Sequence, residues 1–322
     1  MSESLIKIDN LHVETSQDHR TLVDGVSFEI KPGEALGVVG ESGSGKTLTA
    51  LSILGLLPRG VHANSGSINF MGTDLLTADS ESRRAIRGNE ISMIYQDPMT
   101  ALNPVMKLGK QLQEVLEAHD LDDEGAQTRV FNALRDVGIP EPERAMNSFP
   151  HEFSGGMRQR VMIAMALILS PKLLIADEPT TALDVTIQQQ ILALVSEQRR
   201  KSGMSMLWIT HDLGVVANLV DRVIVMYAGR IVEVGTVEQI FTNPQHPYTS
   251  GLLASLPKAI DKNRDRLVAI PGVPPKPWLV ANSCAFAPRC NFVSDICKST
   301  TPVLELNEFT ETACFHRIGG SK

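Results

Sequence analysis

The chain has 322 residues, of which 43% are apolar and 21% are charged, and its formal net charge is −7. This length and composition predict a large folded core with room for a second module. The acidic balance argues against a protein that coats nucleic acid or anionic lipid through a basic patch. No apolar run approaches the ~18 residues of a membrane-spanning helix, and Met1–Leu5 does not resemble a secretory leader, so we expect a cytosolic address.

The first expected elements are strands at 5–13 and 26–30, where apolar and polar residues alternate. A third strand, Ala35–Val39, leads through a glycine-rich loop into a helical pattern at Leu48–Leu57. Its glycines allow positive φ, so backbone N–H groups can converge on an anion at a helix N-terminus. A lysine there reaches the β- and γ-phosphates and a threonine holds Mg²⁺. The predicted nucleoside triphosphate site comprises Gly40, Glu41, Ser42, Gly43, Ser44, Gly45, Lys46 and Thr47.

The remainder of the chain alternates between strands and helices, interrupted by a helical insertion. In chain order, we expect strands at 67–70 and 91–95, a helical region from about 107 to 137, a helix at 158–169, a strand at 173–176, a helix at 187–200 and a strand at 204–209. This alternation predicts an α/β fold with a mostly parallel sheet.

Two carboxylates end the apolar strand at 173–176, where side chains at strand ends face the ligand crevice of an α/β fold. Asp177 is suited to hold Mg²⁺ directly or through water. Glu178 is suited to act as a general base that polarises an attacking water. A nucleotide hydrolase is therefore expected.

A second anion site is predicted where Ser154, Gly155 and Gly156 precede a helix, because the serine can cap the helix and the glycines expose backbone N–H groups. The helical insertion would hold this segment away from the chain's own phosphate loop. The two anion sites are then not expected to meet within one chain.

The four cysteines are Cys284, Cys290, Cys297 and Cys314. In a reducing cytosol, thiols so close in sequence favour a metal or an iron–sulfur cluster over disulfides. Their spacing lacks the paired Cys-x₂-Cys knuckles of structural zinc sites. From spacing alone, a cluster, a zinc site, and free thiols or a disulfide all remain open.

These motifs together resemble the ATP-binding subunits of ATP-binding cassette (ABC) transporters, over nearly the whole chain. The resemblance implies a P-loop NTPase core of the ABC ATPase type with a β-rich N-terminal subdomain, a helical signature subdomain and a C-terminal Cys-containing extension. It places the ATPase domain at 1–245, its helical part at about 98–160, and the extension at 246–322. It also implies that the signature of one subunit closes on the ATP and Mg²⁺ held by the other.

Carried over by residue, the resemblance makes Gln96 the glutamine that senses Mg²⁺ and the attacking water, and His211 the switch histidine that contacts the γ-phosphate. The loop 180–184, which ends in Asp184, would cross the dimer interface. Gln159 of the signature would contribute to nucleotide binding. The usual adenine-stacking aromatic is missing, and only His19 and Arg20 lie in its window.

Within the family, the chain is similar to the oligopeptide and dipeptide import branch. The similarity lies in Asp97–Pro104, His246–Thr249, Leu256–Pro257 and Ile270–Gly272, which precede the cysteines. This branch carries a [4Fe–4S] cluster in its tail, which implies that Cys284, Cys290, Cys297 and Cys314 ligate one here. A cluster without a redox partner would still cross-link the tail.

The expected function is ATP hydrolysis that powers import of peptides or a related small solute by closure and reopening of an ATPase dimer. The implied partners are two membrane permease subunits, a second ABC ATPase subunit that is a copy or a paralogue, and, indirectly, an extracytoplasmic solute-binding protein. The protein would lie peripherally at the cytoplasmic face of the inner membrane. No nucleic acid partner is expected.

The alternative is a soluble ABC-type ATPase that moves no solute. A DNA-repair clamp would need a long coiled coil between phosphate loop and signature. Only 106 residues lie between Thr47 and Ser154, and they show no heptad pattern.

Overall fold

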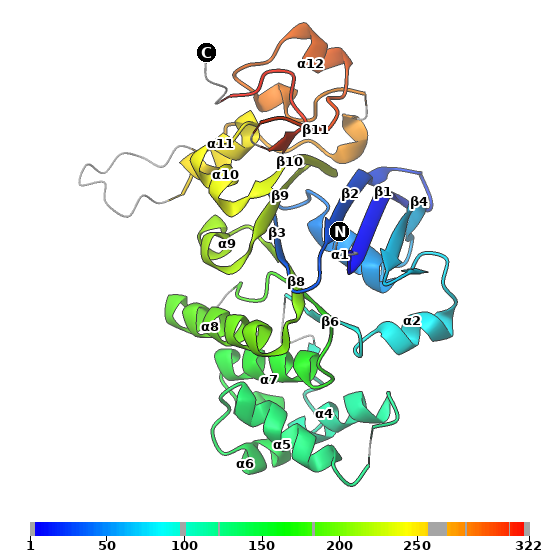
Figure 1. Ribbon diagram of the computed structural model, residues 1–322, viewed down its shortest axis with the longest axis vertical. Helices are drawn as coiled ribbons and strands as arrows, with labels where there is room; N and C mark the ends of the chain where they lie inside the picture. The colour runs from blue at the N-terminus through cyan, green and yellow to red at the C-terminus, as the bar shows by residue number, and fades with distance from the viewer. Residues whose placement is uncertain are drawn as a thin grey trace, which may run out of the picture. The chain divides into compact units, whose positions relative to one another are not determined.

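The computed structural model describes residues 4–96, 101–121, 123–181, 184–256, 269–280, 282–308 and 310–318. The chain divides into two compact units, which are described separately (Figure 1). The first unit takes in residues 1–31, 35–77 and 208–322, and the second takes in 32–34 and 78–207. Within the described residues, no helix combines the length and the apolar character needed to cross a bilayer.

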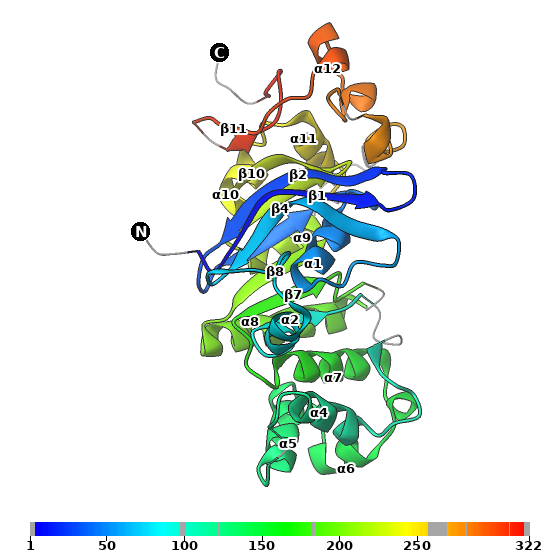
Figure 2. The same cartoon turned by 90° about the vertical axis from the view of Figure 1, so that its right-hand side faces the viewer.

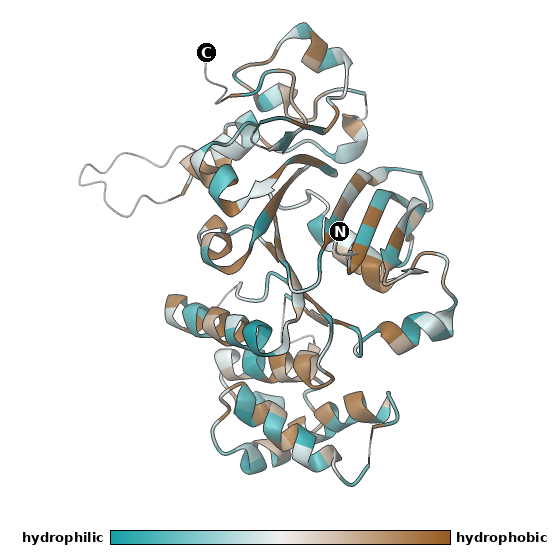
Figure 3. Ribbon diagram, viewed as in Figure 1, coloured by the Kyte–Doolittle hydropathy of each residue, from teal (hydrophilic) through white to brown (hydrophobic). Residues whose placement is uncertain are grey.

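A four-stranded antiparallel sheet in the order β2-β1-β4-β5 begins the first unit. Its strands are β1 (Ile6–Thr15), β2 (Thr21–Ile30), β4 (Val61–Phe70) and β5 (Thr73–Asp74). Side chains alternate between the two faces of a strand, so Ile6 and Ile8 are buried while Lys7 and Asp9 are exposed. Figure 3 shows this alternation as bands of hydrophobic and hydrophilic colour across the sheet. The predicted β-rich N-terminal part is confirmed.

A second sheet of this unit carries the phosphate loop, with strands in the order β11-β12-β10-β9-β3-β8. Its strands are β3 (Ala35–Val39), β8 (Ser205–Thr210), which begins in the second unit, β9 (Arg222–Tyr227), β10 (Arg230–Thr236), β11 (Glu305–Leu306) and β12 (Glu311–Thr312). The pair β3–β9 is parallel, whereas β9–β10, β10–β12 and β11–β12 are antiparallel. The prediction of a mostly parallel sheet is therefore wrong for the outer strands, because these are joined by short turns and by the extension rather than by helical crossovers.

The helices of the first unit are short. They are α1 (Lys46–Leu54), α9 (Leu213–Leu219), α10 (Val237–Thr242), α11 (Pro247–Ala254) and α12 (Asp295–Ser299), with the 3-10 turns η2 (Pro277–Leu279) and η3 (Ala287–Arg289). Helix α1 ends three residues before the predicted Leu57, because Gly55 adopts φ 60° and its N–H closes on the last turn.

The extension is joined to the core sheet through a buried carboxylate. Glu233 of β10 is 0% exposed and accepts hydrogen bonds from the N–H groups of Gln245 (2.7 Å) and His246 (3.0 Å) and from the hydroxyl of Thr310 (3.0 Å). Charge-assisted bonds of this kind offset the cost of burying the ion. The carboxylate therefore holds both the start and the end of the extension.

The second unit consists mainly of helices. Its elements are α2 (Ser80–Ile86), β6 (Ile91–Ile94), α4 (Leu108–Glu117), α5 (Ala126–Asp136), α6 (Pro142–Asn147), η1 (Pro150–Glu152), α7 (Gly155–Leu167), β7 (Leu173–Asp177) and α8 (Val185–Ser202). Strands β6 and β7 pair in parallel. Helices α4, α5 and α6 pack together beside α7, as both ribbon views show (Figure 2). The predicted apolar faces are buried through Leu112 and Leu116 of α4 and Val130 and Leu134 of α5.

Candidate functional site

The predicted strand, loop and helix of the phosphate site are present, with the loop between β3 and α1. Gly43 and Gly45 have φ of 79° and 99°, in the left-handed region that glycine tolerates best. A Cβ on Gly40 would meet the carbonyl oxygen of Met226 at 2.2 Å, so this position admits only glycine without a backbone shift. The loop is thus shaped by backbone approach, as an anion cradle requires.

The lysine of the loop is folded back over it. Lys46 is 6% exposed, and its ammonium donates to the carbonyls of Gly40 (2.8 Å) and Glu41 (3.0 Å) and to the hydroxyl of Ser44 (3.4 Å). These are contacts that phosphate oxygens can replace. Thr47 is exposed at the start of α1, where its hydroxyl is available as a Mg²⁺ ligand.

The C-terminal extension contacts the phosphate loop directly, which the sequence did not predict. The guanidinium of Arg289 makes two bonds to the carboxylate of Glu41, at 2.6 and 3.0 Å. The N–H of Glu41 donates to the hydroxyl of Tyr248 at 2.9 Å. The hydrogen bond to Glu41 raises the pKa of Arg289, and burial raises the pKa of Tyr248. Both extension residues therefore keep their ordinary protonation states and hold Glu41 in place.

The two carboxylates lie at the end of β7 in the second unit. Asp177 is 4% exposed. Glu178 has φ 46°, an uncommon conformation for a residue with a side chain. Its Oε2 accepts hydrogen bonds from the amide of Gln96 (3.2 Å) and the hydroxyl of Thr181 (3.0 Å). The structure thus brings together two residues that the sequence assigned to the same water, and adds Thr181 to them.

The signature residues begin α7. Ser154 caps the helix by accepting from the N–H of Met157 at 3.4 Å. Gly155 is exposed, and a Cβ added there would meet nothing within 4 Å, whereas a Cβ on Gly156 would meet Cγ2 of Ile187 in α8 at 2.8 Å. Gln159 is 1% exposed, and its Nε2 finds no hydrogen-bond partner among the described residues. The exposed end of α7 is the part that can meet a ligand.

The two remaining predicted residues lie in different units. Asp184 is exposed and caps α8 through the N–H of Ile187 at 2.9 Å. Residues 182–183 of its loop, and 97–100 after Gln96, lie outside the described residues. His211 is exposed directly after β8, just before Asp212, which caps α9 by accepting from the N–H of Gly214 at 2.8 Å. Nucleotide roles for Asp184 and His211 stay predictions.

The four cysteines are free thiols. Burial, with smaller contributions from the other three thiols, raises the pKa of Cys314 to about 11. The N–H groups of Phe292 and His316 donate to the sulfurs of Cys290 and Cys314, both at 3.3 Å. Even so, no group of three or more His, Cys, Asp or Glu side chains in the described part of the chain is arranged to hold a metal ion. The predicted iron–sulfur site is not supported by this geometry.

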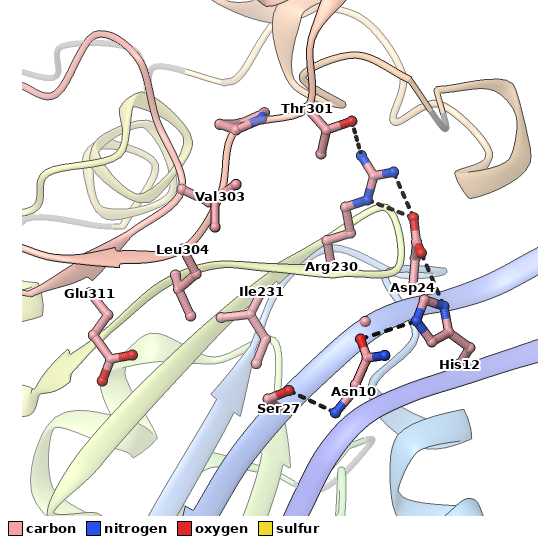
Figure 4. A pocket seen from close by; sticks show the side chains of 13 residues that line it. Asn10, His12, Asp24, Ser27, Arg230, Ile231, Thr301, Val303, Leu304 and Glu311 are labelled. Carbon is pink, nitrogen blue, oxygen red and sulfur yellow. Dashed lines mark hydrogen bonds and ion pairs between the residues drawn. The ribbon is translucent and has the colours of Figure 1, made fainter. Parts of the chain in front are cut away.

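The first unit also contains a cavity of about 550 Å³, and none of the predicted site residues line it (Figure 4). It lies between the β1–β2 hairpin and the extension, and Arg230 crosses it. The guanidinium of Arg230 bonds the carboxylate of Asp24 at 2.6 and 2.8 Å and reaches Thr301 of the extension at 3.4 Å. His12 lies 3.2 Å from the same carboxylate. These contacts fasten the extension to the hairpin.

Comparison with known families gives two matches. The family described as "ABC transporter" matches residues 23–181. The family described as "Oligopeptide/dipeptide transporter, C-terminal region" matches residues 232–297.

Several relatives are similar over most of the chain. The oligopeptide transport ATP-binding protein OppD of Bacillus subtilis is 54% identical over 85% of this chain and 77% of its own length. The OppD of Haemophilus influenzae is 48% identical over 94% of each chain. The dipeptide transport ATP-binding protein DppD of Bacillus subtilis is 49% identical over 93% of this chain and 90% of its own length.

Solved structures agree with these matches. CbiO1 from Clostridium perfringens, part of the ABC transporter complex cbiONQ, has a TM-score of 0.65 at 28% identity and covers 74% of this chain and 91% of its own. The ATP-binding cassette MJ0796, in a dimeric post-hydrolysis state with ADP and Pi, has a TM-score of 0.64 at 25% identity over 72% of this chain and 98% of its own. The predicted ABC ATPase fold is confirmed. The chain therefore belongs to the ABC transporter family, as an ATP-binding subunit that carries the oligopeptide/dipeptide-type C-terminal region.

Proposed function

We propose that this chain hydrolyses ATP to power import of oligopeptides, dipeptides or a related small solute through an ABC transporter. One observation carries the proposal: the OppD and DppD proteins match the chain across both the ATPase region and the extension. A soluble ABC ATPase would not require the transporter-type extension. The proposed site of action is the cytoplasmic face of the inner membrane, where the chain binds two permease subunits peripherally.

In the proposed mechanism, Lys46 and the loop N–H groups bind the β- and γ-phosphates of ATP. The ammonium of Lys46 already lies among oxygen acceptors of the loop, so phosphate oxygens can take their place without a large movement. The ligands proposed for Mg²⁺ are the hydroxyl of Thr47 and the carboxylate of Asp177, with Gln96 close to the metal and the water. When bound, Mg²⁺ spreads the charge of the transferred phosphoryl group.

Glu178 is the proposed general base. Two donors, Gln96 and Thr181, fix its carboxylate through Oε2, so its orientation does not depend on the substrate. A positioned carboxylate can take the proton of an attacking water as the bond to the γ-phosphorus forms. His211 is proposed to contact the γ-phosphate.

The signature and the interface loop are proposed to act on a nucleotide held by a second ATPase subunit, either a copy of this chain or a paralogue. The exposed N-terminal end of α7, with Ser154, Gly155 and Gly156, presents N–H groups and a helix dipole to an anion. Gln159, also predicted to contribute to nucleotide binding, is buried, so its proposed contribution is to support this helix end. Asp184 begins α8 at the same interface. ATP would hold the two subunits together, and hydrolysis would release them.

The tail thiols carry a narrower proposal, that Cys284, Cys290, Cys297 and Cys314 bind a [4Fe–4S] cluster when one is supplied. Its support is the pair of N–H donors to two of the sulfurs, because such hydrogen bonds also stabilise the thiolate sulfurs that ligate a cluster. Anaerobic purification followed by iron and sulfide analysis tests it, with about four irons per chain expected. Iron-free protein after anaerobic reconstitution would refute it. No catalytic step depends on this cluster.

The test of the main proposal is co-purification and reconstitution. The chain is expressed with the two permeases and the second ATPase encoded beside it, extracted from membranes, and placed in proteoliposomes with the cognate binding protein. We expect the four subunits to co-purify and peptide uptake to require ATP. The Glu178→Gln variant serves as the control that assembles but does not transport. ATP hydrolysis by a chain that never associates with the permeases would support the soluble alternative instead.

A further inference from the structure

A second pocket, of about 330 Å³, lies beside the phosphate loop. Ser42, Gly43 and Ser44 of the loop line it, together with the apolar side chains of Leu22 and Leu48. The segment Pro274–Trp278 of the extension, called the wall segment below, also lines it. In both ribbon views the extension lies close to β2, and β2 and η2 are in contact (Figures 1 and 2).

The position of this pocket determines what it can receive. A triphosphate bound by the loop carries its nucleoside on the α-phosphate. The nucleoside must therefore extend out of the loop on a side that is open. Gly43 lines the pocket, and a Cβ added there would meet nothing within 4 Å. The apolar side chains of Leu22 and Leu48 and the ring of Trp278 suit a planar purine, which prefers to pack against apolar and π surfaces.

Trp278 is the aromatic element of the extension segment. The guanidinium of Arg20 lies 5.2 Å from its ring centroid, and the ammonium of Lys276 lies 5.3 Å from it. Both distances are in the range of a cation–π contact, so Arg20, which directly precedes β2, helps to hold the ring. Lys276 is exposed and has a flexible stem, so it can exchange the ring for a phosphate when a nucleotide enters.

The wall segment is anchored before and after the tryptophan. Before the segment, the carbonyls of Ile270 (3.2 Å) and Pro271 (2.8 Å) accept hydrogen bonds from the guanidinium of Arg289. The same guanidinium pairs with Glu41 of the loop. Downstream, Arg230 donates to the carbonyls of Val280 (3.4 Å) and Ser283 (3.2 Å). Two largely buried guanidiniums thus fix the segment against the nucleotide-binding core. A wall held in this way loses little entropy when a ligand binds.

We infer that Pro274–Trp278 forms the outer wall of the nucleoside pocket and that the purine of bound ATP packs against the ring of Trp278. The inference rests on the proposed binding of ATP by the phosphate loop. It assigns to the extension the stacking role for which the sequence offers no aromatic residue near His19 and Arg20. The extension is then part of the nucleotide site and not only a neighbour of it.

The test compares ATP with inorganic tripolyphosphate, which has the phosphates but no nucleoside. Equilibrium binding is measured for the full chain and for Trp278→Ala, Trp278→Phe and Leu279→Ala. Leu279 is adjacent, is 70% exposed, and does not line the pocket, so its variant is the matched control. We expect Trp278→Ala to weaken ATP about tenfold while tripolyphosphate affinity is unchanged, and Trp278→Phe to recover most of the loss.

Fluorescence gives an independent readout, because the chain has two tryptophans and Trp208 is 0% exposed. In Trp208→Phe, ATP should quench the emission of Trp278 and tripolyphosphate should not. Equal weakening of both ligands by Trp278→Ala, or no weakening of ATP, would overturn the inference. If the unaltered chain bound neither ligand, the phosphate loop assignment itself would fail, and this outcome is distinct from the other two.

Discussion

Arg289 and Glu41 are 248 positions apart in the sequence, yet their side chains form a two-bond ion pair with contacts of 2.6 and 3.0 Å. The Arg289 side chain is only 4% exposed, and Glu41 belongs to the phosphate loop. The pair therefore makes the conformation of the loop depend on the extension.

Replacing Arg289 by Met should destabilise the protein, because the variant leaves a partly buried carboxylate without its ion partner. We expect a loss of about 3 kcal/mol in the free energy of unfolding. The double variant Glu41→Gln/Arg289→Met should recover part of that loss. Urea denaturation measures each value. The control is Arg317→Met, which removes an exposed pair with Glu305 (3.2 Å) and should cost under about 1 kcal/mol. Equal losses in the two single variants would contradict the assignment.

Replacing Glu178 by Gln should keep ATP binding but slow hydrolysis about 10²–10⁴-fold, because the amide accepts the same bonds from Gln96 and Thr181 but cannot take a proton. Phosphate release and nucleotide affinity are measured on the same preparation. Glu197→Gln, which alters an exposed acid paired with Lys201, is the control and should hydrolyse ATP at the normal rate. A fully active Glu178→Gln would exclude this residue as the base.

The adjacent glycines of the signature should respond differently to alanine. A methyl on Gly156 meets Ile187 at 2.8 Å and forces α7 and α8 apart, whereas a methyl on Gly155 projects into open space. We expect Gly156→Ala to be less stable than Gly155→Ala by about 1–3 kcal/mol, as seen for overpacked contacts. Thermal and urea unfolding of both variants provide the comparison. Stabilities that agree within error would mean that the helices adjust without cost.

His246 predicts a pH dependence. Burial lowers its pKa from 6.5 to about 3, and its Nδ1 accepts from the N–H of Tyr248 at 3.0 Å, which requires a neutral ring. Between these two pH values the unfolded chain binds a proton that the folded chain does not. Above pH 6.5 the protonation of His246 therefore takes nothing from the free energy of unfolding. Below that pH, the free energy of unfolding falls by about 1.4 kcal/mol per pH unit as the pH drops toward 3.

The matched variant is His246→Asn, whose side-chain oxygen can also cap α11 but does not titrate. Urea midpoints of both proteins are measured from about pH 7.5 down to about pH 5, where this term operates. The slope of the unaltered protein should exceed that of the variant. Parallel slopes would show that the unfolded and folded states protonate this position alike.

The sequence predicted those parts of the site that local pattern determines. The strand Ala35–Val39 is present with the predicted bounds, and helix α7 follows Ser154 as its cap. The left-handed backbone of Glu178 had no local signal, because non-glycine residues reach it only through surrounding contacts. Neither did the contacts of Arg289 and Tyr248 with Glu41, since pairs more than 200 positions apart leave no periodic trace.

The outer strands of the sheet also could not be predicted from local sequence pattern. β12 is two residues long and pairs with β10, which lies far away in the sequence, so no run of apolar residues marks it. The prediction of a mostly parallel sheet extrapolated from alternating helices and strands, and it failed where a short turn joins β9 to β10 and where strands of the extension complete the sheet. Long-range pairing, not propensity, decides these elements.

The buried carboxylate of Glu233 limits how this protein can be dissected. Every donor that the structure shows on it, from Gln245, His246 and Thr310, belongs to the chain after β10. Truncation after residue 245 would remove two of these three donors and leave the Glu233 side chain short of hydrogen-bond partners, so we expect the truncated ATPase domain to be less stable than the whole chain. Engineered fusions or excised cassettes need either the whole chain or a neutral residue in place of that acid.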